Sequence, residues 1–265
     1  MRVQGKVVVV TGAGSGIGRS VALEALARGA RVAAVDLNET TLKETATLAP
    51  IEERVTTHVL DITDPSSVAT LPAGIAEQHG SVDALIHCAG IIQPFTKVAE
   101  LDDAAIQRVF DVNWWGTVHL TRAFLPVFFD RPTAHIVHVS SMGGFLPVPG
   151  QTIYGASKAA VKLFTEGLHA ECSGTNVRVT VVFPGAVATN ITANSGVEIP
   201  SMASAKAHRT TSADDAARMI LDGMESDAYR VLVGRDAKIM DALYRLSPRR
   251  AAALITRQMQ DLLRS

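Results

Sequence analysis

The stretch Lys6-Val7-Val8-Val9-Val10-Thr11-Gly12-Ala13-Gly14-Ser15-Gly16-Ile17-Gly18 joins two kinds of local pattern. Its β-branched first half is typical of a buried strand, and the apolar spacing of the residues that follow is typical of a helix. The glycines therefore lie in a strand-to-helix turn, where the backbone can approach a pyrophosphate and the helix N-terminus offers free N–H groups. A GxGxxG motif would need glycine in place of Ile17, so the pattern is TGxxxGxG. A glycine-rich turn without a ligand is the alternative.

The second predicted strand, residues 31–35, ends on an acidic residue. Asp36 stands about twenty positions beyond the glycine turn, where a carboxylate accepts hydrogen bonds from an adenosine ribose and repels a 2′-phosphate. Leu37 supplies no cation, and Ser15 occupies the turn position where a phosphate-binding arginine or lysine could stand. Arg19 lies inside the helix, and we expect it to face solvent. These features favour NAD over NADP as the bound cofactor.

A tyrosine and a lysine stand four positions apart at Tyr154 and Lys158. On a helix, that spacing places the phenol and the ammonium on one face. A nearby cation favours the phenolate and lowers the tyrosine pKa from its ordinary value of ~10 toward the range that acid/base catalysis needs. The same spacing also occurs on solvated helix faces, so the assignment depends on the other motifs.

Together these motifs make the chain resemble the classical short-chain dehydrogenase/reductase family over nearly all of residues 3–234. The matching features are the TGxxxGxG turn, Asp36, Asp61, Asn113, Ser141, Tyr154, Lys158 and Pro184-Gly185, in the family's order and spacing. The resemblance implies an NAD-dependent oxidoreductase that interconverts a secondary alcohol and its ketone. Its catalytic residues would be Asn113, Ser141, Tyr154 and Lys158.

The resemblance also implies a role for each catalytic residue. Tyr154 would exchange a proton with the substrate oxygen, and Lys158 would lower the tyrosine pKa and bind the nicotinamide ribose. Ser141 stands thirteen residues before Tyr154, as the family pattern requires, and is therefore preferred over Ser140 as the hydrogen-bond donor to substrate. Asn113 would hold a water that links Lys158 to solvent. The implied cofactor-binding residues are Gly12, Ser15, Gly16, Ile17, Gly18, Asp36, Leu37, Asp61, Ile62, Ala89, Gly90, Tyr154, Lys158, Pro184, Gly185, Val187 and Thr189.

One motif departs from the family. Where the family usually has Asn-Asn-Ala-Gly, this chain has His87-Cys88-Ala89-Gly90. Ala89 and Gly90 still allow close passage of the backbone beside the cofactor, but the role of the asparagines in tying the central strands together is in doubt. We expect Cys88 to be a small apolar filler. The His-Cys pair has no partner at metal-ligand spacing, so no metal is expected.

Length and composition agree with one large core. The chain has 265 residues, 47% of them hydrophobic, and a formal net charge of −1, which gives no reason to expect nucleic acid. The first strand begins within a few residues of Met1 and no apolar run approaches the ~20 residues of a membrane span, so we expect a cytoplasmic protein.

The fold expected is α/β: a Rossmann-type, doubly wound parallel sheet in a three-layer α/β/α single domain. Its strands are predicted at 6–11, 31–35, 54–60, 82–87, 134–140, 177–183 and 229–233.

Substrate, assembly and the C-terminus are less sharply indicated. The loop Met142–Gln151 is apolar except for its glutamine, and the stretch Ala186–Ser201 carries a single charge, so a neutral, fairly apolar substrate is favoured. Helices at 112–129 and from 153 onward are apolar on more than one face, which predicts a homodimer or homotetramer.

The predicted core, 1–234, is followed by an amphipathic helical extension, 235–265, broken at Ser247-Pro248. We expect it to pack over the cleft or a neighbouring subunit, and contact with a membrane surface is less favoured.

Two other classes of protein remain open. An epimerase or dehydratase of the extended branch, acting on sugar nucleotides, also uses Tyr-x-x-x-Lys, but it expects glycine near Ser15 and a longer C-terminal substrate region. A catalytically silent NAD-binding protein would be expected to lack at least one of the four catalytic residues, all of which are present.

Overall fold

The computed structural model describes residues 1–189, 191–197 and 210–259. Within them, a seven-stranded parallel sheet has the order β3-β2-β1-β4-β5-β6-β7. Every predicted strand is present, with ends within two residues of those expected. The strands are β1 Val7–Thr11, β2 Arg31–Asp36, β3 Val55–Val59, β4 Ala84–His87, β5 Ala134–Val139, β6 Val177–Pro184 and β7 Arg230–Val233.

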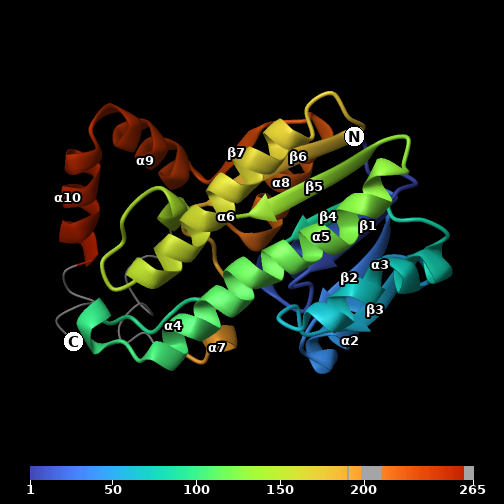
Figure 1. Ribbon diagram of the computed structural model, residues 1–265, viewed down its shortest axis with the longest axis horizontal. Coiled ribbons are helices and arrows are strands. Elements are labelled where there is room, and N and C mark those ends of the chain that lie inside the picture. Colours follow the sequence, from blue (N-terminus) through green and yellow to red (C-terminus); the bar gives the residue numbers. More distant parts are fainter. Residues whose placement is uncertain (190, 198–209, 260–265) are drawn as a thin grey trace.

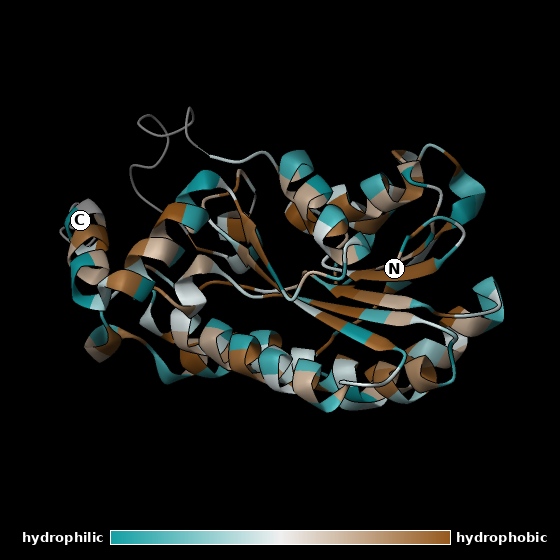
Figure 2. Cartoon of the chain, turned by 90° about the horizontal axis from the view of Figure 1, so that it is seen from above, coloured by the Kyte–Doolittle hydropathy of each residue, from teal (hydrophilic) through white to brown (hydrophobic). Residues whose placement is uncertain are grey.

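Helices cover both faces of the sheet, as Figure 2 shows, and the three-layer prediction is confirmed. The first core cluster joins the sheet to α1, α2 and α8, and the second joins it to α3, α5 and α6. The helices are α1 Gly16–Ala27, α2 Glu39–Thr47, α3 Pro65–His79, α4 Asp103–Phe110, α5 Gly116–Phe129, α6 Thr152–Glu171, α7 Ile191–Ser195, α8 Ala213–Glu225, α9 Arg235–Leu246 and α10 Pro248–Met259 (Figure 1).

The central strands are apolar on both faces because both faces are covered. All five residues of β1 and all six of β5 are buried, as is typical of parallel strands between helix layers. The chain order reverses between β1 and β4, and at such a switch point a ligand crevice forms outside the carboxyl ends of the strands. The glycine turn follows β1 directly, so the fold places it at this crevice.

The helix predicted over 112–129 is not a single regular helix. It begins upstream as α4, passes through a π-helical turn at Asp111–Trp115, and continues as α5. A π turn inserts one extra residue per turn and is frequent at functional sites. Asn113 lies at its centre and is completely buried.

The C-terminal helices pack against the loop that follows Ser141. Met240 of α9 and Ala251 and Ile255 of α10 form a buried cluster with Leu146. The break between the helices is at Ser247, as predicted. Ile239 and Leu246 of α9 are 62% and 85% exposed, so only part of the apolar residues of α9 faces this cluster. The last apolar residues of the extension lie outside the described residues.

In the described ranges, no helix has both the length and the apolar composition needed to cross a membrane.

Candidate active site

The carboxyl ends of β1, β2 and β4 open into a cavity of about 1000 Å³. This volume lies at the upper end of the range for small-molecule sites. The predicted cofactor residues that line it are Gly12, Ser15, Gly16, Ile17, Gly18, Asp36, Leu37, Asp61, Ile62, Ala89, Gly90 and Thr189. Asn38, Thr41 and Asn194, which sequence reasoning missed, line it as well.

The glycine turn has a shape that requires glycine. Gly12 and Gly16 have φ angles of +69° and +51°, in the left-handed region that L side chains rarely adopt. A Cβ on Gly12 would lie 2.9 Å from the backbone of Ala89, so a side chain there would push apart the turns that follow β1 and β4. The Ser15 side chain does not cap α1, which leaves N–H groups of the first turn available to an anion. These residues fit the pyrophosphate of a dinucleotide.

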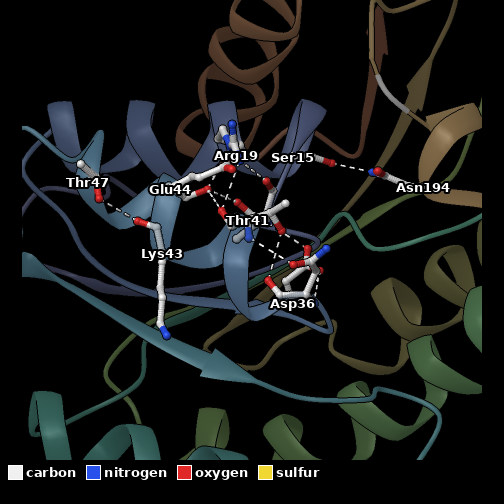
Figure 3. A network of polar contacts seen from close by, with 12 residues as sticks. Ser15, Arg19, Asp36, Thr41, Lys43, Glu44, Thr47 and Asn194 are labelled. Carbon is white, nitrogen blue, oxygen red and sulfur yellow. Dashed lines mark hydrogen bonds and ion pairs between the residues drawn. The ribbon is translucent and has the colours of Figure 1, made fainter.

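Asp36 is held at the rim of the cavity (Figure 3). One carboxylate oxygen accepts a hydrogen bond from the Gly14 N–H at 2.9 Å, and the other accepts from the Asn38 N–H at 3.0 Å. Each carboxylate oxygen can accept more than one hydrogen bond, so both can also receive ribose hydroxyls. The backbone contacts fix the orientation of the carboxylate in advance.

Arg19 does not simply face solvent, which corrects the expectation from sequence. Its guanidinium donates to the backbone oxygens of Gly14 and Thr41, to the Thr45 hydroxyl, and to the Glu44 carboxylate at 2.8 Å (Figure 3). The correction has a tertiary cause, because α2 packs beside the start of α1 and offers acceptors that the local pattern does not reveal. The charge of the arginine is thereby paired beside the glycine turn.

Ser141 and Tyr154, the predicted catalytic serine and tyrosine, lie close together. A Cβ built on Gly143 would be 3.5 Å from Ser141 Oγ and 3.5 Å from Cε1 of Tyr154. Ser141 is positioned by the turn after β5, where its Oγ accepts from the Gly143 N–H at 3.0 Å. The neighbouring Ser140 hydroxyl is buried and donates to the backbone oxygen of Lys158 at 2.7 Å. Ser140 therefore supports the helix, and Ser141 is the serine beside the phenol.

Lys158 and Asn113 meet at Gly90. A Cβ on Gly90 would lie 2.9 Å from Lys158 Nζ and 3.1 Å from Asn113 Oδ1, so Gly90, which lines the cavity, lies directly against both groups. Lys158 Nζ donates to the Val139 carbonyl at 3.0 Å. The Asn113 amide bonds the N–H and the carbonyl of Ile91, both at 2.9 Å. The Asn113 side chain thus holds the segment after β4.

Burial changes the acid/base properties of the pair on α6. It raises the pKa of Tyr154 above its ordinary value, and the opposing interaction with the Ser141 hydroxyl is weaker. Burial lowers the pKa of Lys158 to about 8. The sequence predicts that Lys158 lowers the tyrosine pKa. In the structure, desolvation of the phenolate has the larger effect, and the tyrosine pKa is raised instead. At neutral pH, Lys158 still keeps most of its charge.

Five predicted cofactor residues are not among the residues that line the cavity: Tyr154, Lys158, Pro184, Gly185 and Val187. Pro184, Gly185 and Val187 form the end of β6 and the segment after it, and Val187 pairs with Thr211. Asp236, a residue that sequence reasoning missed, accepts from the Ala186 N–H at 2.6 Å and fixes this segment. No local signal identifies Asp236, because the contact joins residues fifty positions apart. Position 190 and positions 198–201 of the expected substrate loop are outside the described residues.

The His87-Cys88 departure has a structural explanation. His87 Nδ1 shares a hydrogen bond of 2.6 Å with the Thr11 hydroxyl and so links β4 to β1, which supplies a tie in place of the missing asparagine. Burial lowers the pKa of His87 well below its ordinary value, which keeps the ring neutral. Burial raises the pKa of Cys88 to about 12, so its thiol stays protonated. Cys88 is a partly buried filler, as expected.

Comparison with known proteins identifies the same family and the same fold. The family model described as short chain dehydrogenase matches residues 6–199. The putative oxidoreductase SadH of Mycobacterium tuberculosis is 36% identical over 252 residues, covering 92% of this chain and 91% of that protein. The 1-deoxy-11-beta-hydroxypentalenate dehydrogenase of Streptomyces avermitilis is 36% identical over 244 residues, covering 90% and 88%.

Two solved structures carry different cofactors. A short-chain dehydrogenase/reductase from Burkholderia phymatum, in complex with NAD, has a TM-score of 0.80 and 27% identity, covering 93% of this chain and 96% of its own. A short-chain dehydrogenase from Burkholderia cenocepacia, in complex with NADP, has a TM-score of 0.80 and 28% identity, covering 96% and 99%. With the matched family model, these likenesses show that the chain is an oxidoreductase of the classical short-chain dehydrogenase/reductase family.

Proposed function

We propose that this protein is an NAD-dependent oxidoreductase that interconverts a neutral, fairly apolar secondary alcohol and its ketone, with Tyr154 as the acid/base. The observation that carries the proposal is the layout of one cavity. It has an oriented carboxylate, Asp36, in its lining, and Gly90 at its rim lies against Lys158. A dinucleotide bound along the glycine turn would therefore extend from the acidic residue to the catalytic set.

The chain's own residues account for the proton chemistry. Bound NAD would supply the hydride acceptor. Tyr154 would take the proton from the alcohol hydroxyl, and Ser141, beside the phenol, would donate a hydrogen bond to the same oxygen as negative charge develops. Lys158, charged at neutral pH, would favour the phenolate. Buried Asn113 would keep the cavity rim in place through Ile91.

NAD, rather than NADP, is proposed on the electrostatics around Asp36. The carboxylate would repel a 2′-phosphate, and the nearby cation, Arg19, is paired with Glu44 at 2.8 Å. Leu37, 67% exposed beside Asp36, supplies no charge. Relatives of similar overall structure bind either cofactor, so the local charges must decide the preference.

The substrate class is proposed from the loop between Ser141 and Tyr154. Its apolar residues Met142, Phe145, Leu146 and Val148 pack with the C-terminal helices. An anionic substrate would be bound best by an arginine that pairs with its charge. The first cations after β6 in the sequence are Lys206 and Arg209, and both lie outside the described residues. A relative named as a dehydrogenase of a hydroxypentalenate agrees with alcohol oxidation, but the carboxylate in that name gives no support to the neutral charge proposed here.

The proposal is tested by following NAD reduction with a panel of primary, secondary, aliphatic, cyclic and aromatic alcohols. Turnover should be highest with apolar secondary alcohols and should require NAD. Absence of turnover across the panel, combined with tight NAD binding, would instead favour the silent NAD-binding alternative.

Homo-oligomerisation and a cytoplasmic location are part of the same proposal. Leu163 of α6 is 69% exposed, and Trp115 and Phe129, on the segment that contains α5, are each 47% exposed. Helices with apolar residues on their outer face require a partner. We expect light scattering to give the mass of a dimer or tetramer at micromolar concentration, and a monomer would contradict the assignment.

The C-terminal helices provide a test of the substrate region. Ile255→Asp would place a carboxylate in the cluster that packs on Leu146, so α10 should separate from the loop after Ser141. The KM for the alcohol should rise about tenfold because the loop loses its support, whereas NAD affinity should change little. Leu254→Asp, at a position 40% exposed on the same helix, is the matched control. Equal effects of the two variants would show that α10 does not support the substrate region.

A further inference from the structure

Gln93 joins the segment after β4 to the beginning of the helix that carries Tyr154 and Lys158. Its side-chain oxygen accepts hydrogen bonds from the N–H groups of Ile153 at 2.7 Å and Tyr154 at 3.0 Å. Its backbone oxygen accepts from the Gln151 side chain at 2.8 Å. Gln93 is completely buried and Gln151 is 4% exposed. Water therefore does not compete for these contacts.

This is an unusual way to cap a helix. The first N–H groups of a helix are commonly satisfied by a Ser, Thr, Asp or Asn at the N-cap, but Gln151 at that position makes no side-chain cap bond to α6. The amide nitrogen of Gln93 is buried without an acceptor among the described residues. A buried donor without an acceptor is unfavourable. A local cap would avoid it, but a local cap would not join α6 to another part of the chain.

What Gln93 adds is a connection between the cofactor cavity and the catalytic helix. The three residues after Gly90 are each held by a different element of the site. Ile91 is bonded by Asn113 of the π turn, the Ile92 N–H donates to Ser195 of α7 at 3.0 Å, and Gln93 bonds the first turn of α6. The segment 91–93 therefore relates the cavity rim to the π turn, to α7 and to Tyr154.

We propose that Gln93 is a positioning residue for Tyr154. By holding the N-H groups of Ile153 and Tyr154, it fixes the start of α6 relative to Ala89-Gly90, and thereby fixes the phenol relative to bound cofactor and substrate. The inference rests on the proposed role of Tyr154. Gln93 acts in this proposal through its hydrogen bonds to the start of α6, and not through contact with the substrate.

The test compares three variants. Gln93→Leu keeps much of the side-chain volume and removes the acceptor. Gln93→Glu keeps an acceptor for both N–H groups and adds a charge at the start of α6. Gln78→Leu, at an exposed position on α3, makes the same chemical change away from the site and is the control. For each variant, NAD affinity, kcat, KM for the best alcohol of the panel, the pH profile of kcat and the thermal midpoint are measured.

Gln93→Leu should lower kcat about tenfold or more, since a small displacement of a catalytic group has an effect of this size. NAD affinity should change little. Gln93→Glu should recover most of kcat, but only at higher pH. A carboxylate near Tyr154 disfavours the phenolate, so the tyrosine pKa rises and the ascending limb of alcohol oxidation should move upward by about one pH unit. Gln78→Leu should resemble the wild type in every measurement.

Two kinetic results would overturn the inference. One is a Gln93→Leu protein with wild-type kcat and an unchanged pH profile, whether or not its thermal midpoint falls, because that would make the contact structural only. The other is a Gln93→Glu protein whose kcat stays as low as that of Gln93→Leu at every pH, because Gln93→Glu keeps the acceptor for both N–H groups. Tyr154→Phe, assayed in parallel, separates these outcomes from failure of the proposed function, since an active Tyr154→Phe protein would refute the tyrosine mechanism independently of Gln93. Faster amide hydrogen exchange at Ile153 and Tyr154 in Gln93→Leu, measured without substrate, should accompany the loss of the acceptor, and unchanged exchange would show that the tether does not exist.

Discussion

Tyr154→Phe should lower turnover by about 100-fold or more, the range expected for loss of a general acid/base. The substitution removes one hydroxyl and keeps the ring that packs beside Ser141 and Gly143. The backbone contact of residue 154 with Gln93 does not depend on the side chain. NAD binding should therefore stay nearly intact, and the loss should appear in kcat. Turnover with the best alcohol and titration of NAD binding measure the two effects separately.

Tyr229→Phe is the matched control for this experiment. Tyr229 is 43% exposed and makes an edge-to-face contact with His169 away from the cavity, so loss of its hydroxyl should leave turnover unchanged. If Tyr154→Phe keeps more than a tenth of wild-type turnover, the tyrosine cannot be the acid/base of this reaction.

Wild-type protein should prefer NAD over NADP by at least about tenfold in kcat/KM, since one charged contact is worth ~1.5–3 kcal/mol. Combining Asp36→Ala with Leu37→Arg should shift the preference toward NADP. The first change removes the repulsion of a 2′-phosphate, and the second adds a cation at an exposed position beside it. Arg19 cannot readily supply this charge, because it is paired with Glu44 and bonded to the glycine turn. Steady-state kinetics with both cofactors measure the shift.

Leu37→Arg alone separates the two contributions. With Asp36 intact, the new arginine has a neighbouring carboxylate, so the gain for NADP should be smaller than in the double variant. Equal or better wild-type kinetics with NADP would refute the NAD assignment.

The sheet and much of the cavity could be predicted because their signals are local. Uninterrupted β-branched runs such as Val7–Val10 indicate strands buried on both faces, and glycines at 12 and 16 mark a turn with positive φ. The alternation of strands and helices then determines the parallel order, which brings Asp36 and Gly90 to one edge. These features follow from backbone geometry that each short segment expresses by itself.

Other features were decided only by tertiary structure, because they depend on which distant groups meet. Arg19 is drawn to acceptors on α2, and Gln93 caps a helix about sixty residues further along the chain. The π turn at Asn113 has no signal in the apolar pattern, which reads as an ordinary helix. The pKa of Tyr154 is raised rather than lowered because burial of the phenol exceeds the favourable contact with Ser141. The sequence by itself determined which residue types surround the cavity, whereas packing determined their hydrogen-bond partners and their desolvation, and hence their charge.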